Sequence, residues 1–273
     1  MSAAEKTKKA ASGRRQKVTS VLYPVLFGVL ILVLWQTQLL HKILSTDTFT
    51  LPLPSRIVSI ILANFDTIRN NIYATVTVAL SGLILGSLLG YLIAVVATVF
   101  PKWGSGGLKI VSAFNSIPII ALAPVISNWT KDVSSDANVR SMVAKILVVT
   151  VVCTASMSIN AYRGLTELKP STEDLMRSYA SGRLTVFLKL RLPNSLPYIF
   201  TALRISVPAS VIGALVSEYF AEYIIGVGRQ IRENIVLAQY STAWAYIVVA
   251  CFIGIIMYVV LMIAEGILLK NRR

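Results

Sequence analysis

The chain has 273 residues, 55% of them hydrophobic and 14% charged, whereas soluble globular proteins carry about 25% charged residues. This composition argues against a soluble globular domain and indicates that lipid is the main solvent. The net charge is +14, but Lys and Arg gather at the chain ends and in loops. Membrane topology explains that distribution better than nucleic-acid binding, so we expect no nucleic-acid partner.

Apolar residues gather into runs of about 20, the length that an α-helix needs to cross the hydrocarbon core. Helices must carry these runs because lipid cannot satisfy exposed backbone groups. The sequence therefore predicts an all-α polytopic membrane protein with six transmembrane helices. Cys153 and Cys251 both fall inside apolar runs, so we expect neither a disulfide framework nor a metal site.

The first transmembrane helix is expected at residues 21–41, after a basic cytoplasmic tail at residues 1–20. A cleaved signal peptide would have an apolar run of about 7 to 15 residues and a small-residue cleavage site. The run here is longer and ends in Gln38-Leu39-Leu40-His41. We therefore interpret it as an uncleaved helix.

A short amphipathic helix is predicted at residues 54–70, where isoleucines recur at helical spacing, and we expect it to lie at the membrane interface. Residues 72–269 then form the core domain. Its five helices are expected at about residues 72–100, 109–129, 142–160, 197–220 and 243–269. Pro118 and Pro124 fall in the third span, so we expect that span to be kinked or broken.

The distribution of basic residues predicts the orientation in the membrane. With six spans and a cytoplasmic N-terminus, the inner segments hold more than twice as many Lys and Arg as the outer loops. The positive-inside rule therefore places both termini in the cytoplasm, in a multi-pass protein of the cell membrane. The largest inner loop is then residues 161–195.

That inner loop is too long and too patterned for a simple connector. Residues 174–180 predict a short helix, with Ser171 and Thr172 as candidate N-caps and Gly182 as the residue that breaks it. A second helical stretch follows, and Leu192-Pro193 is expected to stop it before the next span. A helix, turn and helix of this kind could transmit force, although an ordinary amphipathic interfacial helix would have the same pattern.

The loop resembles the cytoplasmic signature of ABC importer permeases: Glu-Ala-Ala, three residues, Gly, nine residues, Ile, one residue, Leu-Pro. Its Glu falls on Asp174, its Gly on Ala180 and its Leu-Pro on Leu192-Pro193. A glycine occurs two places later, at Gly182. The resemblance is to the branch that serves nitrate, sulfonate and taurine uptake, with thiamine-precursor and riboflavin relatives, and it extends over about residues 50–270. It includes Glu218 and Gly226-Val227-Gly228.

This resemblance implies a six-helix permease core of the type I importer fold, paired with a second copy across a two-fold axis. It also implies an extracytoplasmic binding protein and a separate ATPase that receives the coupling segment. The residues that would contact the ATPase are Asp174, Leu175, Met176, Arg177, Ser178, Tyr179, Ala180, Ser181, Gly182, Arg183, Leu190, Leu192 and Pro193.

The chain has no glycine-rich phosphate loop that ends in Gly-Lys-Ser/Thr. We therefore expect that this chain is not an enzyme and binds no cofactor, and that ATP and Mg bind the partner ATPase.

Several residues within the spans are candidates for packing or for the solute pathway. Gly82, Gly86 and Gly90 lie four residues apart on one helix face. This spacing favours a seam of close helix packing rather than a substrate groove. Charged residues in spans face protein or water. Lys145 could line the pathway or extend outward, and Glu218 lies at the outer end. Together with these two, the candidate pathway or gate residues are Asn115, Ser116, Ser206 and Ser210.

Two other function classes remain open from the sequence. A secondary transporter or channel would work without an ATPase, but we find neither an internal repeat nor carboxylates deep within the spans. A membrane-embedded enzyme would need a nucleophile with a base, or metal ligands, and the single His41 supplies neither. Small organic anions such as sulfonates are the favoured solutes, followed by a heteroaromatic vitamin or its precursor.

Overall fold

The computed structural model describes residues 19, 22–114, 116–221 and 225–270. Within these ranges the chain is helical and contains no strand. Four helices are long and apolar enough to cross a membrane: α4 (Phe65–Val99), α7 (Ala137–Thr166), the continuous segment Arg183–Phe220 that contains α10 (Leu192–Phe220), and α12 (Tyr240–Leu268). The basic tail expected at residues 1–20 lies outside the described residues, apart from Thr19.

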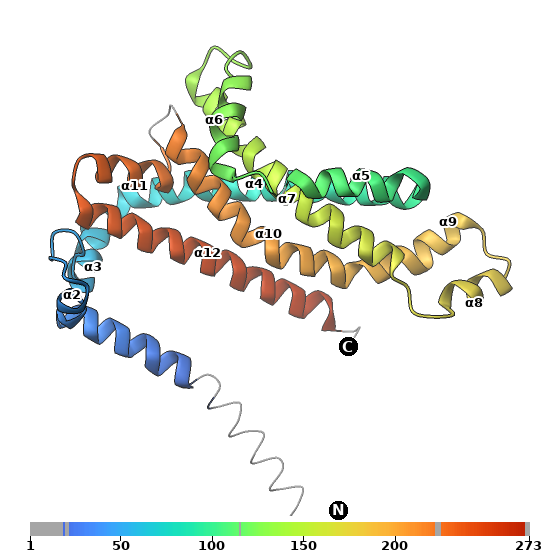
Figure 1. Cartoon of the computed structure of the whole chain (residues 1–273), viewed down its shortest axis with the longest axis horizontal. Coiled ribbons are helices and arrows are strands. Elements are labelled where there is room, and N and C mark those ends of the chain that lie inside the picture. The colour runs from blue at the N-terminus through green and yellow to red at the C-terminus, as the bar shows by residue number, and fades with distance from the viewer. Residues whose placement is uncertain (1–18, 20–21, 115, 222–224, 271–273) are drawn as a thin grey trace, which may run out of the picture.

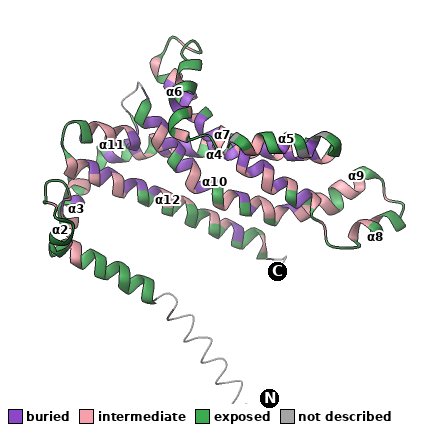
Figure 2. Ribbon diagram, viewed as in Figure 1, coloured by how far each residue is buried: buried purple, intermediate pink, exposed green. Residues whose placement is uncertain are grey.

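The long helices run side by side along the longest axis of the molecule (Figure 1). Helices α4, α7 and α10 form the centre, and buried residues concentrate where they meet (Figure 2). The largest core cluster joins Val78 of α4, Val149 of α7 and Val211 of α10 to Val249 of α12. This core fixes the relative positions of the two ends of the bundle.

Five of the shorter helices lie at the two opposite ends of the bundle (Figure 1). One end carries α8 (Thr172–Ser178) and α9 (Arg183–Val186), and we call it the α8 end. The other end carries α2 (Leu39–Leu44), α3 (Pro54–Ala63) and α11 (Val227–Val236), and we call it the α11 end. Helix α12 finishes toward the α8 end.

The first apolar run forms helix Leu22–Gln36, which is exposed over almost its whole length (Figure 2). The helix ends earlier than residue 41, because Gln38 has a left-handed φ of 62° and a separate helix, α2, follows. Gln36 then bonds to Ser55: its Nε2 donates to Ser55 Oγ and its Oε1 accepts from Ser55 N, both at 3.1 Å. The first helix is therefore attached to the rest of the chain near its C-terminal end.

The interfacial helix expected at residues 54–70 is divided at Asn64. The side chain of Asn64 donates to the carbonyl of Ile60 at 3.0 Å, and the backbone leaves the helical region with φ −114° and ψ 26°. Residues 65–70 therefore belong to α4, which begins earlier than the predicted position 72. At about 1.5 Å per residue, its 35 residues exceed the thickness of the hydrocarbon core.

The third span is broken, as its two prolines predict. It consists of α5 (Pro101–Phe114) and α6 (Ile119–Trp129), and Pro118 is the N-cap residue of α6. Pro124 lies inside α6, which continues past it. Neither piece is long enough to span a membrane as a straight helix.

The predicted stop at Leu192-Pro193 is wrong. Helix α9 continues through a π-helical segment, η1 (Phe187–Arg191), directly into α10, with Pro193 in the first turn of α10. In this wider turn the N–H of Leu192 donates to the carbonyl of Phe187. A π-turn can accommodate a residue that has no N–H to donate. The chain from Arg183 to Phe220 is therefore one helix.

Candidate coupling site and outer clamp

The loop at the α8 end is closed at its base by side chains from the end of η1 and the start of α10. Asn194 Nδ2 donates to the carbonyls of Gly164 at 2.7 Å and Glu167 at 3.1 Å. Arg191 donates to the carbonyl of Leu165 at 3.4 Å. The last carbonyls of a helix have no partner within it, so these contacts satisfy the end of α7. They also hold the end of α7 against the beginning of α10.

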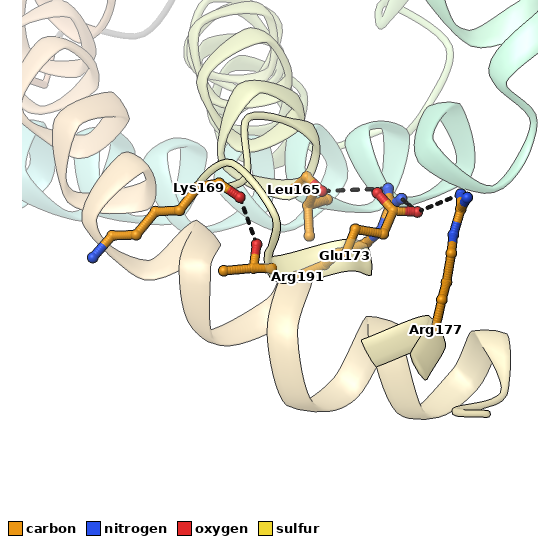
Figure 3. A network of polar contacts seen from close by, with 6 residues as sticks. Leu165, Lys169, Glu173, Arg177 and Arg191 are labelled. Atoms are coloured by element: carbon orange, nitrogen blue, oxygen red, sulfur yellow. Dashed lines mark hydrogen bonds and ion pairs between the residues drawn. The ribbon is translucent and has the colours of Figure 1, made fainter. Parts of the chain in front are cut away.

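Helix α8 is held by ion pairs that meet at one carboxylate. Glu173 Oε1 lies 3.4 Å from Arg177, one turn later in α8, and 3.6 Å from Arg191 in η1. Figure 3 shows Glu173 between these two guanidinium groups, with the carbonyl of Leu165 also facing Arg191. Asp174, which occupies the Glu position of the signature, is exposed and makes no ion pair among the described residues.

The turn after α8 is a Schellman motif. Ala180 has a left-handed φ of 49° and donates its N–H to Arg177 O at 2.8 Å, and Ser181 donates to Met176 O at 3.1 Å. The position that ends the helix is therefore Ala180, where the signature has glycine. The expectation that Gly182 breaks the helix is wrong, because Gly182 has an ordinary φ of −67° and open space around it.

The predicted N-caps of α8 also do not act as caps. Ser171 is the N-cap residue but makes no side-chain capping bond, and its φ is 66°. Thr172 Oγ1 donates backward to Lys169 O at 2.7 Å. The sequence pattern located the start of the helix, but it did not predict the hydrogen bonds there.

Helices α8 and α9 expose large apolar side chains. Leu175 is 57% exposed, Tyr179 76% and Leu184 71%, and α8 has no buried residue. Met176, Ser181, Leu190 and Pro193 are partly buried, while Asp174, Arg177, Ser178, Gly182, Arg183 and Leu192 are exposed. Several exposed apolar side chains on neighbouring short helices are typical of a protein-docking surface.

At the α11 end, polar side chains hold a backbone turn in place. Glu218 has no exposed surface, and its Oε2 accepts from Thr75 Oγ1 at 3.0 Å and from the N–H of Gly228 at 2.8 Å. Thr75 Oγ1 in turn accepts from Val227 N at 2.9 Å, and Asn71 Oδ1 accepts from Gly226 N at 2.9 Å. We call Asn71, Thr75 and Glu218 with residues 226–228 the outer clamp.

Two glycines make the outer clamp possible. Gly226 has a φ of 127°, and a Cβ there would lie 2.3 Å from the carboxylate carbon of Glu218. A Cβ on Gly228 would lie 2.2 Å from the carbonyl oxygen of Leu215. Side chains at either position would push the turn away from α10.

Comparison with known proteins identifies the family. The family model described as "Binding-protein-dependent transport system inner membrane component" matches residues 82–273. The chain belongs to this family. It is similar to the formylaminopyrimidine transport permease protein ThiX of Halalkalibacterium halodurans, with 26% identity over 256 residues, 92% of this chain and 96% of the relative.

Two further similarities agree with that assignment. A probable ABC transporter permease protein of Haemophilus influenzae is 25% identical over 199 residues, 73% of this chain and 77% of the relative. An inward facing structure of the MetNI methionine ABC transporter superposes with a TM-score of 0.62 at 15% identity, covering 77% of this chain and 97% of that one. A second crystal form gives a TM-score of 0.56 at 16% identity.

The fold is therefore that of a type I ABC importer permease, and the chain is a membrane-spanning permease subunit. Within this permease the glycines of the predicted seam lie against α7. An added Cβ would lie 2.4 Å from Val149 Cβ at Gly82, 2.6 Å from Thr150 O at Gly86 and 2.6 Å from Thr154 O at Gly90. Glycine is thus required along this face of α4 for the two helices to approach.

The candidate pathway residues lie in different surroundings. Lys145 is 6% exposed, donates to Ile225 O at 3.3 Å and lines a groove of about 340 Å³ with Tyr73, Thr77, Asn138 and Met142. Ser206 and Ser210 have no exposed surface and lie in the packed face of α10. Ser116 is exposed, and Asn115 lies outside the described residues. Of these candidates only Lys145 lines that groove.

One ion pair joins two long helices of the permease toward the α8 end. Arg204 of α10 donates to both carboxylate oxygens of Glu265 of α12, through Nε at 2.8 Å and a terminal nitrogen at 2.5 Å. Glu265 is 7% exposed. The two-point contact of the guanidinium fixes both the distance and the orientation of the partner.

Sequence reasoning missed Asn71 and Thr75. Both lie in the apolar helix α4, more than 140 residues from their partners in the outer clamp. The available signal was the presence of polar side chains one turn apart in an apolar run, which in a membrane protein indicates a buried polar contact.

Proposed function

We propose that this permease imports a small heteroaromatic solute of the aminopyrimidine class, delivered by an extracytoplasmic binding protein and driven by a separate ATPase. The observation that carries the coupling to an ATPase is the exposed apolar surface of α8 and α9, on a loop that is tied to two spans. ATP and Mg bind the ATPase and not this chain. In the wild-type complex the ATPase docks on Leu175, Tyr179 and Leu184.

We infer that the α8 end and both termini lie in the cytoplasm. Support comes from the excess of Lys and Arg in the segments on that side and from α12, which finishes toward the α8 end (Figure 1). The outer clamp then lies on the opposite side of the membrane, where a binding protein arrives.

The permease acts as a homodimer in the membrane. In the most apolar part of α12 only 17% of residues are buried within the chain, and in α4 only 33%. Faces of this kind contact lipid or a second copy. The described part of a single chain provides a groove at Lys145, and a second copy would complete the pathway.

The proposed solute class rests on similarity to the formylaminopyrimidine permease over 92% of the chain. Sequence reasoning alone favoured sulfonate-like anions over heteroaromatic compounds. The two classes make different demands, because an anion requires positive charge along the route whereas an uncharged aromatic ring does not. Lys145 is the basic residue of the described groove, and its Nζ is already bonded to Ile225 O.

The test is uptake into proteoliposomes that contain the permease, its co-purified ATPase and its binding protein. We expect a labelled formylaminopyrimidine to accumulate on the side of the membrane that holds the ATPase when ATP is supplied there. A non-hydrolysable ATP analogue should give no accumulation. Accumulation of taurine instead would assign the sulfonate class. Uptake by the permease without the ATPase would overturn the importer proposal in favour of a secondary transporter.

A further inference from the structure

Arg191 contacts three segments of the coupling loop at once. It belongs to η1, which continues into α10, and one terminal nitrogen donates to the carbonyl of Leu165 in the last turn of α7 at 3.4 Å. The other terminal nitrogen lies 3.6 Å from Glu173 of α8. Its side chain is only 23% exposed. One guanidinium group therefore lies between α7, α8 and the start of α10 (Figure 3).

The contact with Arg191 differs from the contact with Arg177, although both use the same oxygen of Glu173. Arg177 is one turn along the same helix and its side chain is 72% exposed, so that pair links α8 only to itself. The Arg191 pair instead links α8 to the membrane bundle. Of the two ion pairs, only this second one can carry a displacement of α8 to the membrane bundle.

Helix α8 has no other firm attachment among the described residues. None of its residues is buried. The remaining side-chain hydrogen bonds of α8 are local: Thr172 bonds to Lys169 and Ser178 bonds to Leu175. Without the Glu173–Arg191 pair, α8 would be connected through its flanking turns alone, one of which contains the left-handed Ala180.

We propose that Arg191 and Glu173 are a positioning pair that transmits movement of α8 to α7 and α10 when the ATPase closes. This inference rests on the proposed docking of the ATPase at α8 and α9. It assigns a role to Glu173, which precedes the signature position, and not to Asp174. Partly exposed ion pairs contribute little to stability, so we expect the bundle to remain folded when this pair is removed.

The experiment uses the complete permease–ATPase complex in lipid nanodiscs. Hydrogen exchange is measured by mass spectrometry without nucleotide and with ATP plus vanadate. Exchange in residues 172–181 reports docking, and exchange in residues 160–167 and 183–191 reports transmission to the bundle. The variants are Arg191→Met, Arg191→Lys, Glu173→Gln and the double variant Arg191→Met with Glu173→Gln. The matched control is Lys189→Met, which removes an exposed basic side chain two residues from Arg191.

In the wild type and in Lys189→Met we expect nucleotide to change exchange in both regions. In Arg191→Met the change in residues 172–181 should remain while the change in residues 160–167 is lost, and Arg191→Lys should retain part of it. Glu173→Gln should reduce the nucleotide-dependent change in residues 160–167. The double variant should lose no more of this change than Arg191→Met alone, since both substitutions remove the same Glu173–Arg191 contact.

Three results would contradict the inference. Arg191→Met could behave like Lys189→Met, it could lose the ATPase altogether, which would make Arg191 a docking residue, or the two substitutions could be additive. Failure of the proposed function gives a different result, because no ATPase would then co-purify with the wild-type chain.

Discussion

The backbone N–H of Gly228 donates to the buried carboxylate of Glu218 at 2.8 Å. The two residues lie on either side of the connection between α10 and α11, and the bond draws α11 against the end of α10. Thr75 of α4 donates to the same carboxylate oxygen at 3.0 Å. Three helices are thus fixed at one oxygen atom, at the end of the permease opposite to α8 and α9.

Removal of the Thr75 hydroxyl should weaken the outer clamp. Thr75→Val keeps the side-chain shape but leaves the buried N–H of Val227 without its acceptor and removes one donor to Glu218. Each unsatisfied buried group costs about 1–3 kcal/mol. We expect a lower Tm in detergent-solubilised permease. The control is Thr77→Val, whose hydroxyl bonds only to Tyr73 O one turn earlier, and equal Tm values for both variants would contradict the clamp.

Gly226→Ala should be more damaging than its size suggests. The backbone there has φ 127° and ψ 151°. Residues other than glycine adopt this backbone conformation at a cost of about 1–3 kcal/mol. The added Cβ would also overlap Glu218. Gly254→Ala in α12, where nothing lies within 4 Å of an added Cβ, should leave Tm unchanged or raise it slightly. A tolerated Gly226→Ala would show that the turn has another conformation in solution.

The turn after α8 should respond to substitution at Ala180 and not at Gly182. Ala180→Val places a β-branched side chain at a left-handed φ of 49°, which costs about 1 kcal/mol or more. Gly182→Ala fits its ordinary φ and open surroundings. We expect trypsin to cleave Ala180→Val faster than wild type at Arg177 and Arg183, and Gly182→Ala at the wild-type rate or slower. The reverse order would place the turn at Gly182.

The Arg204–Glu265 pair should show strong coupling in a double-mutant cycle. Arg204→Leu leaves Glu265, which is 7% exposed, without a counter-ion, whereas replacing both partners by apolar residues is often nearly neutral. We expect Tm to fall most in Arg204→Leu and to recover in Arg204→Leu with Glu265→Leu. Glu265→Leu should be intermediate, because the long Arg204 side chain can reach water. Additive losses would mean that the two side chains act independently.

Sequence reasoning located the long helices because membrane spans are specified by local features, namely the length and apolarity of a run. It also predicted the break in the third span, since Pro118 interrupts the helix at its own position. The same local reasoning was wrong at Leu192-Pro193, because a π-turn compensates for the missing N–H of the proline. Proline limits one hydrogen bond, and the neighbouring turn decides whether the helix continues.

The contacts of the site were less predictable, because they join residues far apart in the chain. Thr75 reaches Glu218 across 143 positions, and no periodicity records such a pair. Ala180 illustrates a second difficulty: its left-handed backbone is set by the hydrogen bonds that close α8, so the presence of a nearby glycine pointed to the wrong residue. Only the alignment with the permease signature indicated position 180.

The most direct test of the central claim is whether an ATPase co-purifies with the tagged permease and depends on the exposed apolar surface of α8 and α9. The variant is Leu175→Asp with Leu184→Asp, and the control is Val133→Asp, a 59% exposed side chain in the loop before α7. We predict that wild type and control retain the ATPase and that the double variant loses it while remaining monodisperse. Equal recovery from all three, or none from wild type, would contradict the account of a permease coupled through α8.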